Sequence, residues 1–224
     1  MIMTKARLVR TRGTQGTLAK VLATGAGTDR SHGLVWALFN DGEKTARDFL
    51  FREIEPGSYL IVSSSAPTDP HRLWHLESKQ GYEPVLATGD RLSFVLRANP
   101  VVTAPRPGQK RGLRADAIMH AKSKLGPAQR KAFTSADASA IAVEWLAKRG
   151  PANGFDLDTS VTSAEGYLQL RVAHKPDKPP IQFSQIDISG ALTVRDPALM
   201  LSALTKGIGK ARAYGCGLML VRRM

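Results

Sequence analysis

The stretch Gln185-Ile-Asp-Ile-Ser-Gly-Ala-Leu-Thr-Val194 decides the fold class. Apolar and polar residues alternate along it, which is typical of a β-strand with one buried and one exposed face. The apolar positions are Ile186, Ile188, Leu192 and Val194. A strand of this kind must bury its apolar face against another layer, so we expect an α/β sandwich.

The residues around this strand predict the rest of the second half of the chain. Asp196 is placed to cap a helix that has Pro197 in its first turn and that ends at Gly207. A last strand is expected over Leu218–Arg222. The elements expected before the quoted strand are a helix and two strands, over Ala136–Arg149, Phe155–Val161 and Tyr167–Ala173.

The first half predicts the order strand, helix, strand, strand, short helix, strand. Ser31 is placed to cap the first helix, and Glu55-Pro56-Gly57 is a hairpin turn signal between the middle strands. The six elements are expected over Ile2–Arg10, His32–Asn40, Asp48–Ile54, Ser58–Ser65, Thr68–Glu77 and Arg91–Arg97. This is the order of a ferredoxin-like domain. The second half is a weak duplicate of it, so the predicted fold class is α+β.

A change of composition separates the two halves. Residues 100–135 are rich in Pro, Gly, Lys and Arg and poor in apolar residues, which indicates a basic linker or loop. The predicted domains are therefore residues 1–99 and 136–224. A chain of 224 residues is long enough for two such domains with their own cores.

Positive charge is concentrated in three segments. The chain has 32 Lys and Arg against 19 Asp and Glu. Segments 1–30, 101–135 and 203–224 carry net charges of +5, +7 and +5, whereas the remainder sums to −4. Such a footprint favours a polyanionic ligand, most simply nucleic acid. A generally basic proteome is the alternative, and a membrane surface is less favoured because no basic amphipathic helix stands out.

Several classes of protein are disfavoured. The single cysteine, Cys216, rules out an intrachain disulfide and the Cys spacing of a zinc site, and its place between two glycines suggests a small buried residue. No apolar run approaches the roughly 18 residues of a membrane span, and the first residues lack the apolar stretch of a signal peptide. We therefore expect a soluble, cytoplasmic protein.

The densest candidate motif is Gly207-Ile-Gly-Lys-Ala-Arg-Ala-Tyr-Gly-Cys-Gly217. Its glycines permit positive φ and close approach of the backbone to a ligand, while Lys210 and Arg212 add positive charge. The segment joins a helix to a strand, whereas a dinucleotide fingerprint joins a strand to a helix. A turn that tightens the helix against the sheet is the purely structural alternative.

Of the five histidines, His32 is the candidate for proton transfer, because it starts a short helix after a loop and is expected to be partly exposed. A purely structural histidine is the alternative. His71 and His75 are four residues apart but have no third ligand nearby, so a metal site is not expected. His120 and His174 lie among basic residues and are candidates for phosphate contact.

Four stretches carry a family resemblance. They are His32-Gly-Leu-Val-Trp-Ala-Leu-Phe39, Ala46–Arg52, Leu96-Arg-Ala-Asn-Pro100 and Gly207–Leu218. Through them the chain resembles the CasE family, the CRISPR RNA-processing endoribonucleases of the type I-E system. The first stretch is similar to the helix that starts at the family's active-site histidine, and the last to its glycine-rich loop. With the matching order of elements, the likeness covers nearly the whole chain.

The resemblance implies two ferredoxin-like domains in tandem and a metal-independent endoribonuclease. It implies cleavage of CRISPR repeat transcripts at the base of their stem-loop by attack of a ribose 2′-hydroxyl, which leaves a 2′,3′-cyclic phosphate and a 5′-hydroxyl. The implied partners are the repeat RNA, the mature crRNA that stays bound, and the other subunits of the type I-E surveillance complex, Cascade. No metal, no cofactor and no membrane are implied.

The resemblance assigns catalysis to His32 as a general acid or base, a role that supplies roughly 10²–10⁴-fold. RNA binding is expected from the basic segment 101–135, from the hairpin between the second-half strands and from the glycine-rich loop. The expected RNA-binding residues are Arg97, Lys110, Arg111, Arg114, His174, Lys175, Lys178, Gly207, Gly209, Lys210, Arg212, Gly215 and Gly217.

Two residues depart from the family pattern. Asp29 stands three residues before the histidine, where family members carry a tyrosine that assists catalysis, and Lys210 stands where proline is common. Asp29 supports an alternative function, that of a non-catalytic subunit that binds an RNA stem-loop in a ribonucleoprotein assembly. A third hypothesis is a sheet-based RNA-binding protein unrelated to CRISPR.

Overall fold

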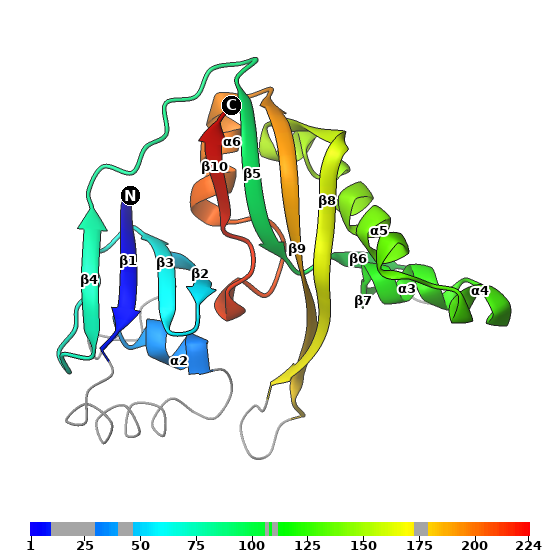
Figure 1. Cartoon of the computed structure of the whole chain (residues 1–224), viewed down its shortest axis with the longest axis horizontal. Helices are drawn as coiled ribbons and strands as arrows, with labels where there is room; N and C mark the ends of the chain where they lie inside the picture. Colours follow the sequence, from blue (N-terminus) through cyan, green and yellow to red (C-terminus); the bar gives the residue numbers. More distant parts are fainter. Residues whose placement is uncertain (10–29, 40–46, 106–107, 109–111, 173–178) are drawn as a thin grey trace.

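The computed structural model describes residues 1–9, 30–39, 47–105, 108, 112–172 and 179–224. Its strands form two four-stranded antiparallel sheets and one two-stranded sheet. Figure 1 shows the first large sheet on the left and the second in the centre, with most of the helices gathered around the second. In the part of the chain that is described, no helix is long and apolar enough to cross a membrane.

The first sheet has the strand order β2-β3-β1-β4. Its strands are β1 (Ile2–Leu8), β2 (Phe49–Glu55), β3 (Ser58–Ser63) and β4 (Trp74–Lys79). Helix α2 (Arg30–Trp36) connects β1 to β2 and buries Leu34 and Val35 against the sheet. Gly57, at φ +80°, makes the turn between β2 and β3 that the sequence predicted.

Strand β2 is buried on both faces, which explains its run of apolar residues. Phe49 and Phe51 belong to the core that α2 covers. Leu50 points the other way and packs with Val62 and with Leu218, from the segment that leads into the last strand. The first sheet is therefore packed against the C-terminal end of the chain, and this packing brings the glycine-rich segment close to α2.

The second sheet has the order β10-β5-β9-β8. Its strands are β5 (Arg91–Ala98), β8 (Phe155–Val172), β9 (Ile181–Val194) and β10 (Met219–Arg223). Helices α5 (Ser135–Ala147) and α6 (Pro197–Lys206) supply buried side chains to the same core. Taken in chain order, each large sheet places its strands fourth, first, third, second. This arrangement confirms the predicted α+β class with two ferredoxin-like units.

The segment expected to be a basic linker is largely folded. It contains strands β6 (Val101–Ala104) and β7 (Leu113–Asp116), which pair with each other, and helices α3 (Ala117–Ser123) and α4 (Pro127–Lys131). Ala117 and Ile118 are buried in the second core. The low apolar content hid this structure, because few apolar side chains of the described part of the segment pack against the second core.

The strand expected over Arg91–Arg97 forms, but in a different sheet from the one predicted. As β5 it pairs with β9 and β10, and Leu92, Phe94 and Leu96 are buried in the second core. The edge strand of the first sheet beside β1 is instead β4 (Trp74–Lys79), which pairs with β1. The helix expected over Thr68–Glu77 was therefore a wrong prediction. We accordingly propose a domain boundary in residues 80–90 in place of residue 99.

Two smaller predictions also need correction. The strands expected over Phe155–Val161 and Tyr167–Ala173 are one long strand, β8, with irregular register between Asp158 and Ser163 and again beside Gly166, whose φ is +67°. Ser31 lies within α2 and not before it as a cap. The predicted caps of α6 are confirmed. At its start the Asp196 carboxylate accepts from the backbone N–H groups of Ala198 and Leu199, and at its end Gly207 is the C-cap.

Candidate active site and nucleic-acid groove

His32 lies in the first turn of α2, where the helix meets the C-terminal loop. Its imidazole packs beside Trp36, four residues further along the helix, with ring centroids 5.7 Å apart. On another side it packs beside Tyr214, at 5.6 Å. Tyr214 belongs to the 3₁₀ turn η2 (Arg212–Tyr214) within the glycine-rich segment. The structure thus brings together two motifs that are about 180 positions apart in the sequence.

Polar contacts fix the start of α2 on the hairpin of the first sheet. The Tyr59 hydroxyl donates to Ser31 Oγ at 3.2 Å, and Ser31 Oγ donates to Glu53 Oε2 at 3.2 Å. Glu53 also accepts from the N–H of Gly57 at 3.0 Å. The helix turn that carries His32 is therefore tied to β2 and β3.

The glycine-rich loop, residues 207–217, is compact because its glycines adopt conformations that other residues avoid. Gly207, Gly209, Gly215 and Gly217 all have φ between +79° and +92°. A Cβ on Gly207 would lie 2.8 Å from Leu50 Cδ2, and one on Gly215 would lie 3.3 Å from Phe51 Cε2. These glycines therefore allow the loop to pack closely against β2 of the first sheet, whereas the structural alternative in the sequence was a turn that tightens the helix against its sheet.

Backbone hydrogen bonds close this loop and attach it to β5. The N–H of Ile208 donates to the Gly217 carbonyl at 2.9 Å, and the N–H of Gly217 donates to the Arg97 carbonyl at 2.7 Å. The Arg212 guanidinium donates to the carbonyl of Lys206, at the end of α6. Cys216 is fully buried beneath the loop, as predicted. Lys210, by contrast, is exposed.

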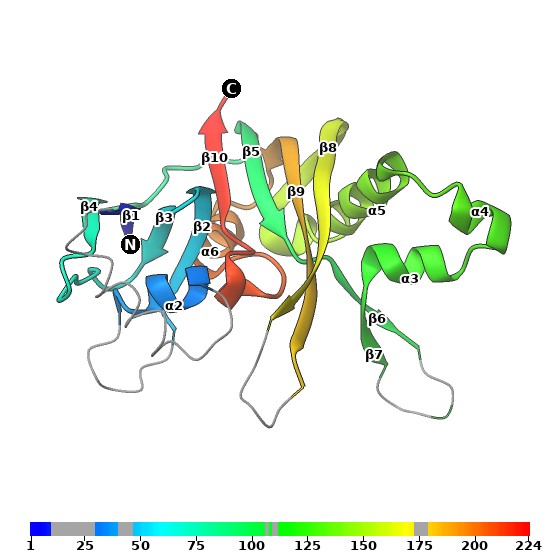
Figure 2. The ribbon, with the colours of Figure 1, turned by 60° about the horizontal axis from the view of Figure 1, so that its bottom comes forward.

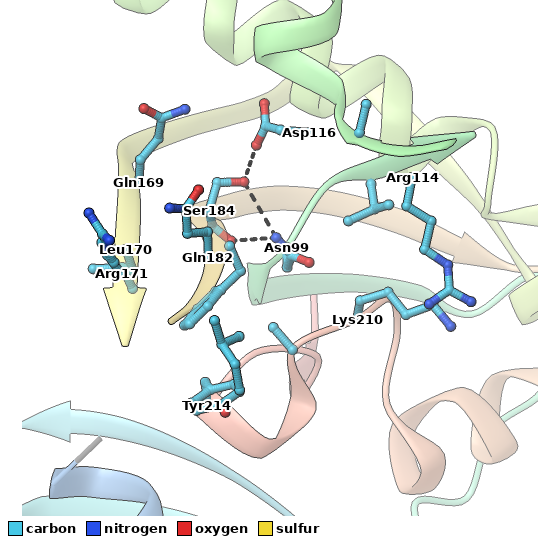
Figure 3. Close-up of a pocket in the computed structure, with 15 residues that line it drawn as sticks. Asn99, Arg114, Asp116, Gln169, Leu170, Arg171, Gln182, Ser184, Lys210 and Tyr214 are labelled. Carbon is cyan, nitrogen blue, oxygen red and sulfur yellow. Dashed lines mark hydrogen bonds between the residues drawn. The ribbon is translucent and has the colours of Figure 1, made fainter. Parts of the chain in front are cut away.

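A groove of about 750 Å³ opens beside the loop. Figure 3 shows its walls, which come from β7, from the β8–β9 hairpin and from the loop. Its lining residues are Asn99, Val101, Arg114, Ala115, Asp116, Gln169, Leu170, Arg171, Ile181, Gln182, Phe183, Ser184, Lys210, Ala211 and Tyr214. In Figure 2 the lower end of the hairpin and α2 project to the same side of the molecule, with the loop between them.

Three exposed cations line this groove: Arg114 from β7, Arg171 from β8 and Lys210 from the loop. None of them forms an ion pair with a carboxylate of the described residues. Arg114 and Lys210 extend toward one end of the groove, whereas Arg171 lies at the other (Figure 3). A groove with cations at both ends can bind two or more phosphates of one RNA strand.

A polar network forms the floor of the groove. Asn99 Nδ2 donates to the Ser184 carbonyl at 2.7 Å, and Ser184 Oγ donates to the Asp116 carboxylate. Asp116 also accepts from the N–H of Met119 at 2.6 Å, which caps α3. Burial, followed by the negative charge of Asp116, raises the pKa of Tyr167 above its ordinary value. The network fixes β7 and α3 against β9.

Arg97 is not free to reach into solvent, although it was expected to bind RNA. Its guanidinium forms two hydrogen bonds with Asp187 of β9, which raise the pKa of Arg97 above its ordinary value. Arg52 of β2 contacts the same carboxylate at 3.3 Å, and burial lowers the pKa of Arg52 although Asp187 opposes the shift. Arg52 and Asp187 lie within stretches quoted from the sequence, but neither residue was assigned a role, because nothing in the sequence places them in contact.

The structure brings together some of the predicted site residues and leaves others undescribed. Arg114 and Lys210 share the groove, whereas the four loop glycines and Arg212 are not among its lining residues. Lys110, Arg111, His174, Lys175 and Lys178, like Asp29, lie outside the described residues. Sequence reasoning missed Phe183 and Arg171. Ile181 and Phe183 alternate with polar residues at the start of β9, on the opposite face from Ile186 and Ile188. Tyr214 was inside the quoted motif, but nothing in the sequence placed it beside His32.

Among the described residues, the histidines other than His32 lie on separate parts of the fold: His120 belongs to α3, and two others lie in or before β4. His75 lies on β4, where it contacts Glu77 at 3.3 Å, and His71 precedes that strand and is exposed. Over the described ranges, no three His, Cys, Asp or Glu side chains are close enough together to hold a metal ion.

Comparison with known proteins places the chain in a family. A model of the family described as CRISPR associated protein matches residues 1–223. The CRISPR system Cascade subunit CasE of Escherichia coli K12 is 26% identical over 194 residues, which cover 84% of this chain and 88% of that protein. Thermus thermophilus Cse3 bound to an RNA that represents a pre-cleavage complex has a similar fold, with a TM-score of 0.68, 23% identity and coverage of 99% and 98%. Cas6e from E. coli K-12 matches over 100% of both chains at 20% identity, with a TM-score of 0.59.

Proposed function

Since this chain belongs to the family of CRISPR associated proteins, we propose that it is a metal-independent endoribonuclease that cuts CRISPR repeat transcripts at the base of their stem-loop. The observation that carries the proposal is the place of His32. It packs beside Tyr214, and Tyr214 lines a groove with three exposed cations that form no ion pair within the described residues. A histidine beside a polyanion-binding groove is the arrangement that RNA cleavage by proton transfer requires.

The proposed reaction needs no redox partner. The ribose 2′-oxygen forms a bond to the adjacent phosphorus while the bond from phosphorus to the 5′-oxygen breaks. The proton leaves the 2′-hydroxyl, and a proton is delivered to the departing 5′-oxygen. The products are a 2′,3′-cyclic phosphate and a 5′-hydroxyl. His32 is the group that we assign to one of these transfers, which supplies roughly 10²–10⁴-fold in rate.

The cations of the groove have a separate task. The pentacoordinate phosphorane carries more negative charge than the starting phosphate, and fixed positive groups lower its energy. Lys210 is the best placed of the groove cations, because it stands four residues before Tyr214 in the same loop. Arg114 and Arg171 are assigned to binding the RNA backbone, as are the expected RNA-binding residues of the hairpin tip.

We further propose that the product crRNA stays bound and that the protein acts as a subunit of a Cascade surveillance complex. The curated relative is named as a subunit of Cascade, and the Cse3 structure contains RNA. Retention is consistent with a groove walled by three separate elements, because RNA that lies in it is held from several sides. The assembly would form in the prokaryotic cytoplasm.

The test is cleavage of a labelled stem-loop that carries the repeat of the CRISPR array in the same genome, in the presence of EDTA. The native protein should cut once at the stem base, whereas His32→Ala and a substrate with a 2′-deoxy sugar at the scissile position should bind without cleavage. His71→Ala, an exposed histidine distant from the loop, is the matched control and should cut normally. Loss of activity in EDTA would overturn the metal-independent mechanism.

A second function, binding of the stem-loop without cleavage, is favoured by one observation. Asp29 replaces a tyrosine that assists catalysis in the family that the chain resembles, and a carboxylate at that place repels phosphate. Under this function the native protein binds the stem-loop tightly in the same assay but never cuts it.

A further inference from the structure

The imidazole of His32 is held by two rings that come from distant parts of the chain. The Trp36 ring lies at 5.7 Å and is tilted by 42°, and the Tyr214 ring lies at 5.6 Å and is tilted by 41°. Both distances are within the range of favourable aromatic contacts. Trp36 shares a helix with His32, so its position is set locally. The position of Tyr214 depends on how the second sheet and its loop are placed.

Tyr214 is fixed in place by the backbone around it. Ala211, at φ +54°, precedes the 3₁₀ turn, and Gly215, at φ +81°, follows it. The N–H of Tyr214 donates to the Ala211 carbonyl at 2.9 Å. Gly215 is seated on Phe51, since an added Cβ would lie 3.3 Å from the ring. The turn therefore has little freedom to move relative to the first sheet.

The other neighbour of Tyr214 is Phe183 of β9. The two rings are stacked, with centroids 4.9 Å apart and planes inclined by 27°. Phe183 pairs with Leu170 of β8, near the tip of the hairpin. Both residues line the groove, and Figure 3 shows Tyr214 there together with Lys210. RNA that occupies the groove would therefore contact Phe183 and Tyr214, and Tyr214 in turn contacts His32.

We propose that Tyr214 is a positioning residue for His32. Its ring transmits the placement of the β8–β9 hairpin to the imidazole, so that His32 takes its reactive orientation when RNA occupies the groove. The contacts to His32 and to Phe183 are ring contacts, so we expect a phenylalanine ring at position 214 to serve the same role. The inference rests on the proposed function, and goes beyond it by naming the residue that links RNA binding to the histidine.

The test compares Tyr214→Phe, Tyr214→Leu and Phe183→Leu in single-turnover cleavage with saturating protein across pH 5–9. Tyr214→Leu should lower the maximal rate by about 10- to 100-fold, which is the scale of a misplaced catalytic group. It should also alter the pH profile, while affinity for a 2′-deoxy stem-loop changes by less than about threefold. Phe183→Leu should lower the rate less, and Tyr214→Phe should restore it.

Two results would overturn the proposal: a Tyr214→Leu protein that cleaves at the native rate with the native pH profile, or a Tyr214→Phe protein as impaired as Tyr214→Leu. Tyr82→Leu, which removes a partly buried tyrosine that packs against Leu50, Val62 and Leu218 and does not line the groove, is the control for loss of a tyrosine ring.

A measurement without cleavage separates this inference from the proposed function. The imidazole proton resonances of His32, assigned with His32→Ala, are shifted by the ring current of Tyr214. Addition of a 2′-deoxy stem-loop should move them in the native protein and in Tyr214→Phe but not in Tyr214→Leu. If the native protein never cleaves RNA, the proposed function fails while this coupling can still be observed. If cleavage occurs and the resonances are insensitive to Tyr214, only the inference fails.

Discussion

Arg97 and Asp187 form a two-point ion pair between neighbouring strands of the second sheet. Arg97 Nε donates to Asp187 Oδ1 at 3.0 Å, and Arg97 Nη2 donates to Oδ2 at 2.8 Å. Arg52 of the first sheet donates to the same Oδ1 at 3.3 Å. One carboxylate therefore links the sheet that carries His32 to the sheet that carries the hairpin and the glycine-rich loop. Bidentate geometry makes such a link directional as well as attractive.

Asp187→Asn should destabilise the protein, because it removes the charge that compensates two partly buried arginines. The Arg52 side chain is only 14% exposed, and its Nη1 has no hydrogen-bond partner among the described residues. We expect the free energy of unfolding to fall by about 2 kcal/mol, as measured by urea denaturation. Asp156→Asn is the control, because Asp156 meets Arg195 at 3.7 Å with both side chains about 60% exposed. A change there should be within about 0.5 kcal/mol, and equal effects at both sites would contradict the prediction.

Alanine in place of Arg114, Arg171 or Lys210 should weaken RNA binding through loss of a phosphate contact. Each substitution should lower the slope of log affinity against log salt by about one unit and weaken binding to all stem-loop sequences alike. Titrations of labelled RNA at several salt concentrations measure the slope. Arg195→Ala, at the end of β9 opposite to the groove, should leave the slope as it is. A groove variant with the native slope would remove that residue from the RNA interface.

Gly217→Ala should be more costly than Gly166→Ala, although both glycines have positive φ. At Gly166 an added Cβ meets no atom within 4 Å, so only the backbone strain of about 1 kcal/mol applies. At Gly217 the Cβ would lie 2.9 Å from Arg212 Cγ and 3.0 Å from the Ile208 carbonyl oxygen, which is part of the backbone and cannot rotate away. That overlap adds about 1–3 kcal/mol. Thermal unfolding of the two variants measures both losses of stability. Equal losses would show that the loop has room to adjust around an added Cβ at position 217.

Local sequence patterns were sufficient for elements that are stabilised by their own residues. The alternation in Gln185–Val194 gave β9, and Asp196 with Gly207 gave the limits of α6. The assignment of β5 to a sheet failed for a physical reason. Its partners are residues 186–193 and 219–223, about 90 or more positions away, and an alternating strand carries no signal for which of two sheets it will join.

The candidate site also contains features that local motifs predict and contacts that they do not predict. His32 and the glycine-rich loop could be found from motifs, and so could the basic character of the segment that contains Arg114. The contact between His32 and Tyr214, and the link from Arg52 to Asp187, are consequences of how the two sheets pack together through Leu50 and Leu218. No spacing rule predicts such contacts, because they depend on the complete tertiary structure.

The last prediction concerns pH and the start of α5. The backbone N–H of Thr134 donates to Asp137 Oδ2 at 2.7 Å and the Thr134 hydroxyl donates to it at 2.8 Å, which together hold the pKa of Asp137 below its ordinary value of 3.8. The folded state therefore favours the ionised carboxylate, and this contribution to stability is complete above pH 3.8 and is lost as the pH falls through the lower folded pKa.

Asp137→Asn should be less stable than the native protein at neutral pH, and the difference should shrink as the solution is acidified below pH 3.8. Thr134→Val keeps the backbone donor and removes the hydroxyl, so it should lose only part of the same pH dependence. Urea denaturation from pH 2 to pH 7 measures the free energy of unfolding of all three proteins. A difference between the native protein and Asp137→Asn that does not vary with pH would show that the hydrogen bonds from Thr134 do not stabilise the charged carboxylate.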